Sequence, residues 1–215
     1  MGAYRQQNNY MKNEHYYTKG TVTAVLRTDA VTDFTKEVLL QRMVQIEKPP
    51  TFFTIDEINL LSLVCDLLLD QDKTQRICNP AIEIDRRLTK NDADGWRYDR
   101  MPTDRIAYKK GLQGIEESAH TTYVKPFAQL QKKQQAQLLQ QLQTGNITGT
   151  VWQTLPAKIF FEELLAEVVA IFYSHPLAQE EIGYTGMADA AGWHKIGMNE
   201  KDEIEADELT INKNT

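Results

Sequence analysis

The chain has 215 residues, of which 41% are hydrophobic and 25% are charged, and this composition is typical of a soluble globular protein. The formal net charge is −6, and the sequence contains neither a basic stripe nor a run of interleaved basic and aromatic residues, which excludes nucleic-acid binding. The longest apolar runs are far shorter than the ~20 residues that a membrane-spanning helix requires.

Residues 1–20 are rich in Asn, Gln and Tyr, and they are predicted to form a flexible N-terminal arm. The arm contains no apolar core of a signal peptide and no twin arginine. A cytoplasmic location is therefore expected, or the periplasmic side of the membrane if the chain is exported together with a partner.

Two helices are predicted in the first third of the chain. The first begins near Thr32 and ends before the Pro-Pro pair at 49–50, since proline cannot continue a helix. The second opens at Thr54, because Thr54 and Glu57 have the spacing of a capping box. Residues 21–26 form either a short helix or an extended segment.

Three further helical patterns occupy the middle of the chain. A short apolar segment over residues 82–88 follows Pro80. The next helix begins after Thr103, and its apolar residues recur every three or four positions. Residues 129–143 are rich in glutamine, but their leucines keep a helical face. A solvated helix is predicted there, with Gly145 as its C-terminal stop.

The clearest helical pattern runs from Ala157 to Tyr173. Its apolar residues fall on one arc, about 140° wide in helical projection, which predicts a helix buried along that face. The helix is predicted to end at Ser174-His175-Pro176, because proline disfavours helical geometry in the residue before it. The apolar arc consists of Ala157, Phe160, Phe161, Leu164, Leu165, Val168, Ile171 and Phe172. The other side of the helix carries Lys158, Glu162, Glu163 and Glu167.

Residues 174–198 carry aromatic and histidine side chains between glycines, and they show neither a helical nor a strand period. A long loop is predicted here, and long ordered loops in compact domains are usually functional. Tryptophan and tyrosine are enriched at interface hot spots, so this loop is the candidate site for binding a partner. The alternative is that the loop folds back over the long helix and that Trp193 closes the core. The candidate partner-binding residues are His175, Pro176, Ile182, Tyr184, Trp193 and Ile196.

Together these patterns predict an all-α protein, with a single domain of five to six helices and a long C-terminal loop. The helical domain spans residues 21–198. Residues 199–215 hold six acidic residues against two lysines and form an acidic C-terminal tail.

The sequence offers few candidates for chemistry. The motifs G-x-G-x-x-G, G-x-x-x-x-G-K-[ST] and G-x-S-x-G are absent. Glu117 and His120 have the Glu-x-x-His spacing of di-iron bundles, but such sites require a second pair, which the sequence lacks. His175, His194 and Asp189 are a candidate mononuclear metal site, although their spacing does not favour it over loop packing. No catalytic, cofactor-binding or metal-binding residue is therefore predicted.

Short motifs are spread along the chain in a recognisable order, and in this order they resemble the gluconate 2-dehydrogenase subunit 3 family. The resemblance covers roughly residues 50 to 200, and its most specific part is the last third. The motifs are Thr54-Ile55-Asp56-Glu57, Asp94-Gly95-Trp96-Arg97-Tyr98, Tyr108-Lys109-Lys110-Gly111-Leu112, Gln137-Leu138-Leu139, the run from Phe160 to Val169, Tyr173-Ser174-His175-Pro176 and Glu181-Ile182-Gly183-Tyr184.

The resemblance implies a small, all-helical, non-catalytic subunit of a membrane-associated flavin dehydrogenase. Its expected partner is a large subunit of the glucose-methanol-choline (GMC) oxidoreductase type, which carries FAD and oxidises a sugar or sugar acid. A cytochrome c subunit often takes the electrons onward. The small subunit is expected to support the folding and export of the large one, and no cofactor is expected in this chain itself.

Two features depart from the family pattern. Many members begin with a twin-arginine signal, which is absent here, and residues 181–186 replace the more common Gly-Gly-Asn after the proline. The large subunit and its substrate therefore need not be those of gluconate oxidation. Two other functions stay open, namely a self-sufficient metal-dependent helical enzyme and a binding module of unknown partner.

Overall fold

The computed structural model describes residues 20–44, 49–92, 99–186, 195, 197–202 and 205. Every regular element in these residues is helical, which confirms the predicted all-α class. The α-helices are α1 (Thr21–Val25), α2 (Asp33–Met43), α3 (Ile55–Leu69), α4 (Pro80–Lys90), α5 (Asp104–Tyr123), α6 (Lys132–Thr144), α7 (Ala157–Tyr173) and α8 (Pro176–Glu181), with 3-10 turns η2 (Phe127–Gln129) and η3 (Val151–Gln153).

The predicted number of five to six helices is too low for the part of the chain that the structure describes. The undecided segment near residue 21 is helix α1, and the predicted loop after residue 174 contains helix α8. These helices are five and six residues long. Neither length covers two full turns, so an apolar period has no room to show in the sequence.

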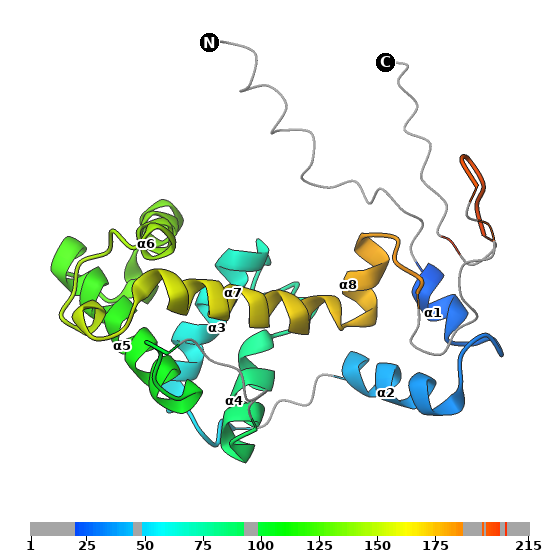
Figure 1. Cartoon of the computed structure of the whole chain (residues 1–215), viewed down its shortest axis with the longest axis horizontal. Coiled ribbons are helices and arrows are strands. Elements are labelled where there is room, and N and C mark those ends of the chain that lie inside the picture. Colours follow the sequence, from blue (N-terminus) through cyan, green and yellow to red (C-terminus); the bar gives the residue numbers. More distant parts are fainter. Residues whose placement is uncertain are drawn as a thin grey trace, which may run out of the picture. The chain divides into compact units, whose positions relative to one another are not determined.

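The chain divides into two compact units (Figure 1). Unit 1 comprises residues 1–45 and 173–215, and its described helices are α1, α2 and α8. Unit 2 comprises residues 46–172 and contains the helices from α3 to α7. Most of the predicted N-terminal arm over residues 1–20 and most of the acidic tail over residues 199–215 lie outside the described residues, so these two predictions stay open.

Local sequence signals set several helix ends in unit 2. The predicted capping box is present, because the Thr54 hydroxyl accepts from the Glu57 N–H and the Glu57 carboxylate accepts from the Thr54 N–H. Asn79 caps α4, with Pro80 at the first helical position. Gly145 ends α6 in the left-handed conformation, as predicted.

A buried carboxylate fixes the segment that leads into α3. Asp85 on α4 is 6% exposed and accepts hydrogen bonds from the backbone N–H groups of Thr51, Phe52 and Phe53, at 2.9, 3.0 and 2.8 Å. Charge-assisted bonds of this kind offset the cost of burying the carboxylate. They also place the Phe53 ring in the core, 6.3 Å from the ring of Tyr108 on α5.

Glycines on α5 let aromatic rings pack directly on its backbone. A Cβ atom at Gly111 would lie 2.0 Å from the ring of Phe160 on α7, and one at Gly114 would lie 2.5 Å from the ring of Trp152. Real Cβ atoms do not approach other atoms so closely. Phe160 is 2% exposed, and its ring centroid lies 6.0 Å from that of Tyr108. The predicted apolar arc of α7 is confirmed as the face that packs into the core of unit 2.

Glu167 lies outside the apolar arc of α7, as predicted, but it does not simply face solvent. Its carboxylate receives two hydrogen bonds from the Arg87 guanidinium of α4, at 2.6 and 2.8 Å, and one from the Tyr108 hydroxyl of α5. Arg87 also donates to Asp104, at 2.6 Å. Burial, followed by the charge of Glu167, raises the pKa of Tyr108 well above its ordinary value, so the hydroxyl stays a donor. This cluster joins three helices of unit 2.

We predict that Gly111→Ala destabilises the chain. At a solvent-exposed position inside a helix, replacing glycine by alanine raises the free energy of unfolding by about 0.5–1 kcal/mol. Here the new methyl group must displace the Phe160 ring, so a net loss of about 1–3 kcal/mol is expected in chemical denaturation. Gln113→Ala, on the exposed side of the same helix, is the control and should change stability by less than about 0.5 kcal/mol. Combining Gly111→Ala with Phe160→Leu should be less destabilising than the sum of the two changes, and strict additivity would contradict the proposed contact.

We also predict that Glu167→Gln costs about 1–3 kcal/mol of stability, because Arg87 loses a charged partner in a half-buried site. The matched control is Glu162→Gln on the same helix. Glu162 pairs with Lys158 at 3.8 Å, and both side chains are largely exposed, so its loss should cost less than about 0.5 kcal/mol. Equal denaturation midpoints for the two variants would show that the cluster contributes no more than a surface ion pair.

Candidate docking surface

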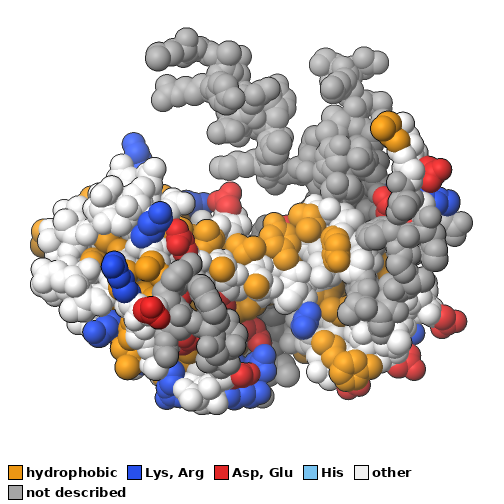
Figure 2. All heavy atoms as spheres, in the orientation of Figure 1, with side chains coloured by type: hydrophobic (Ala, Val, Ile, Leu, Met, Phe, Trp, Pro, Cys, Tyr) orange, Lys and Arg blue, Asp and Glu red, His pale blue; other side chains and the backbone are white. Residues whose placement is uncertain are grey.

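Helix α2 and its C-cap residue carry three apolar side chains that are exposed to solvent. Phe34, Leu40 and Val44 have 77%, 50% and 64% of their surface exposed. At 100° per residue they lie within about 120° of one another, and the buried Leu39 points the other way. The same arc also holds exposed polar residues, namely Asp33, Glu37 and Gln41, so the three apolar side chains do not form a continuous stripe. In Figure 2 hydrophobic side chains reach the surface over α2, at the lower right. Because large apolar side chains on a helix are normally turned inward, Phe34, Leu40 and Val44 are candidate interface residues.

Helix α8 stands where the sequence pattern predicted a loop, and its ends carry clear local signals. His175 is the N-cap, and its Nδ1 accepts a hydrogen bond from the Leu177 N–H at 3.2 Å. Pro176 occupies the first helical position. At the other end Gly183 is left-handed, with φ of 64°. The Gly183 and Tyr184 N–H groups bond to the carbonyls of residues 180 and 179, which is a Schellman motif.

The two other helices of unit 1 hold α8 in place. The Glu180 carboxylate of α8 accepts hydrogen bonds from the Gly20 N–H at 2.8 Å and from the Thr23 N–H and hydroxyl at 3.0 Å, which caps the start of α1. On the other side Arg42 of α2 donates from Nη1 to the Ser174 carbonyl at 2.8 Å. Helices α1 and α2 therefore both pack against α8.

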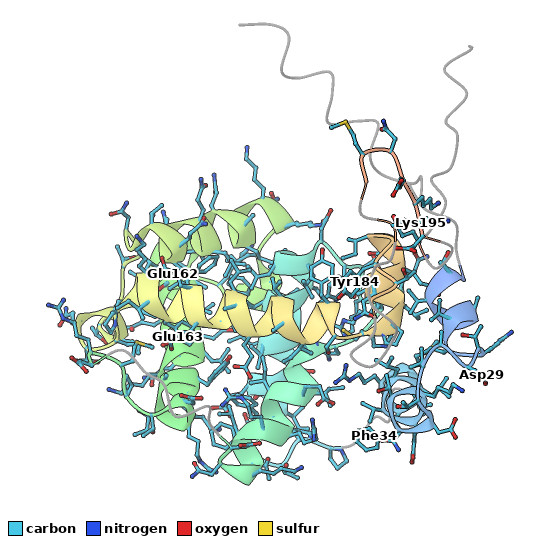
Figure 3. All side chains as sticks on the ribbon, turned by 45° about the vertical axis from the view of Figure 1, so that its right-hand side comes forward. Asp29, Phe34, Glu162, Glu163, Tyr184 and Lys195 are labelled. Carbon is cyan, nitrogen blue, oxygen red and sulfur yellow. The ribbon has the colours of Figure 1, made fainter. Side chains whose placement is uncertain are left out.

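Three apolar side chains on and after α8 remain accessible. Leu177, Ile182 and Tyr184 have 37%, 46% and 48% of their surface exposed. Figure 3 shows Tyr184 beside α8, and it shows Phe34 on α2. Together with the three side chains of α2 and its C-cap they make up what we call the exposed apolar set of unit 1, namely Phe34, Leu40, Val44, Leu177, Ile182 and Tyr184. Tyr173 and Met198 of this unit are exposed as well and are not counted in the set.

The six predicted partner-binding residues have different surroundings. Ile182 and Tyr184 belong to the exposed apolar set. His175 is 4% exposed and Pro176 is buried, so these two residues position α8 within the free chain. Trp193 and Ile196 lie outside the described residues. Whether any of the six contacts a partner stays a prediction.

The predicted partner-binding residues do not include Phe34, Leu40, Val44 or Leu177. A signal for the first three was present, because the apolar residues of the helix after Thr32 fall on more than one side. A helix that is buried on a single face would not need them. Leu177 lay within the segment read as loop, so no helical face was assigned to it.

The candidate metal ligands do not converge in the described residues. Glu117 accepts hydrogen bonds from the Thr150 N–H and hydroxyl and from the Val151 N–H, and these bonds, chiefly those of Thr150, lower its pKa. The carboxylate thus caps η3. No group of three or more potential ligands is found in the described part of the chain, which does not include His194 or Asp189. Among the same residues, no helix is both long enough and apolar enough to cross a membrane.

Comparison with known proteins gives one match. The family model described as gluconate 2-dehydrogenase subunit 3 matches residues 55–198. No curated protein and no solved structure is significantly similar to the chain. The matched segment begins at the first residue of α3, extends past α8 and covers well over half of the sequence. The chain therefore belongs to the gluconate 2-dehydrogenase subunit 3 family.

Proposed function

We propose that the chain is the non-catalytic small subunit, or a dedicated chaperone, of a GMC-type dehydrogenase that carries FAD and acts on a sugar or sugar acid. The observation that carries this proposal is the family match over residues 55–198, because the family is named as a subunit of gluconate 2-dehydrogenase. In this proposal FAD and the catalytic residues belong to the large subunit. The chain resides in the cytoplasm unless it is exported together with that subunit.

The exposed apolar set supports a docking role. Single exposed apolar residues are common on protein surfaces and occur in unit 2 as well. The exposed aromatic residues of the described part of the chain, however, are Phe34, Tyr173 and Tyr184, and all three belong to unit 1. Tyr184 is a good anchor, because tyrosine supplies a large rigid contact area and a polar group that can bond to the partner. Phe34 is the most exposed aromatic side chain of the set. We propose that these two residues insert into pockets of the large subunit.

The surroundings of the exposed apolar set suit a rigid docking element. The Schellman motif fixes the backbone at Tyr184, and Glu180 fixes α8 on α1. A side chain held in this way loses little conformational entropy on binding, which favours affinity. We propose that binding covers an apolar area of the flavoprotein that would otherwise be exposed while it folds.

The test is capture of the flavoprotein by the affinity-tagged chain, purified from its source organism. We expect a co-purified GMC-type protein that is yellow and that reduces a dye with a sugar or sugar acid. Tyr184→Ala should weaken its binding about 30-fold, equivalent to a 2 kcal/mol hot spot, while the melting temperature of the isolated chain barely changes.

The matched control is Ile106→Ala on α5 of unit 2, since Ile106 has the same exposed fraction as Tyr184, 48%. This variant should capture the flavoprotein as well as the wild type does. Wild-type preparations that never contain a flavoprotein would contradict the proposed function. Undiminished capture by Tyr184→Ala would remove Tyr184 from the interface and leave the function standing.

A further inference from the structure

We propose that His175 is a protonation-sensitive cap, which holds α8 against α2 while its ring is neutral and releases α8 when the ring is protonated. His175 supplies the acceptors for the hydrogen bonds at the beginning of α8. Pro176 has no N–H, the Leu177 N–H donates to the His175 ring, and the Ala178 and Gln179 N–H groups donate to the His175 carbonyl at 3.0 and 3.1 Å. One residue therefore satisfies the whole first turn of the helix.

The ring can act as this cap only when Nδ1 carries no proton. A hydrogen bond from the Leu177 N–H requires the lone pair of Nδ1. In the imidazolium form Nδ1 becomes a donor, so two N–H groups would face each other. The added positive charge would also lie at the N-terminal end of a helix, where a cation is unfavourable.

The surroundings of the ring oppose the charge as well. His175 is 4% exposed, and the charged group that acts on it from α2 is the Arg42 guanidinium. Burial lowers the pKa of His175, the backbone of Arg42 partly offsets this, and the positive charge of Arg42 lowers the pKa further. The buried Nε2 has no hydrogen-bond partner among the described residues.

No carboxylate compensates from the other elements described around α8. Helix α1 has the sequence TVTAV and carries no titratable side chain. Glu180, on α8 itself, is bonded to Gly20 and Thr23. The end of α7 brings Tyr173, which is not a carboxylate.

The sign of the pH dependence follows from these contacts. In the released state the ring is hydrated and titrates near the ordinary histidine value of about 6.5. The packed state binds a proton less readily than the released state does. Packing of α8 is therefore complete above about pH 6.5 and weakens as the pH falls, by at most tenfold in the packing equilibrium for each pH unit.

Release of α8 would change the positions of the Leu177, Ile182 and Tyr184 side chains on the surface of unit 1. That consequence rests on the proposed function, because it matters only if these side chains dock a partner. The switch itself is a property of the isolated chain. It can therefore fail while the proposed function stands, and the reverse also holds.

The test is amide hydrogen exchange on the full chain between pH 5 and 8, with rates converted to protection factors at each pH. For the amides of Leu177 and Ala178 we expect constant protection above about pH 6.5 and a loss of up to tenfold per pH unit below it. His175→Asn keeps a good N-cap without a titrating group, so its protection should not depend on pH.

The control is His120→Asn, which removes an exposed histidine of α5 and should retain the wild-type profile. Constant wild-type protection down to pH 5 would overturn the proposal. So would an unchanged profile in His175→Asn, because that variant retains His15, His120 and His194. A second measurement needs no variant: an NMR titration of the wild-type His175 ring should give a pKa below 6.5, and a value at or above it would equally overturn the proposal.

Discussion

The contact of Phe160 with the backbone of α5 is the constraint on which the arrangement of unit 2 depends. It requires glycine at position 111, since any Cβ there would overlap the ring. The same ring packs against the ring of Tyr108, and its centroid lies 6.1 Å from that of the Trp152 ring. Phe160 therefore fixes the position of α7 relative to both α5 and η3. With α7 at this position Glu167 reaches Arg87 and Tyr108, and the polar cluster can form beside the apolar contact.

Features decided within a few residues of sequence could be predicted, and features decided by partners far away in the sequence could not. The capping box at Thr54 and the apolar face of α7 follow from local spacing. The partner of Glu167 is 80 residues away on α4, and a helical projection places every unpaired acid on the solvent side. Helix α8 was missed for another reason. Its cap is a histidine, which is not among the preferred N-cap residues, and its six residues show no period.

The family model matches residues 55–198, which we call the family segment, and unit 1 combines residues from inside and outside it. Helix α8 lies within residues 55–198, whereas α1 and α2 precede them. Glu180 ties α8 to α1, and Arg42 ties α2 to the residue before His175. Half of the exposed apolar set comes from α2 and its C-cap residue. The candidate docking surface is therefore shared between the family segment and the residues that precede it, and the histidine cap lies where the two meet.

The central claim is that the exposed apolar set of unit 1 is the surface that docks the flavoprotein. Its most direct test is a hydrogen-exchange footprint of the chain, alone and bound to the co-purified flavoprotein. The account predicts that the amides of α2 and of residues 176–186 become protected in the complex, while those of α5 keep the protection of the free chain. Protection confined to unit 2, with α2 and α8 unchanged, would contradict it.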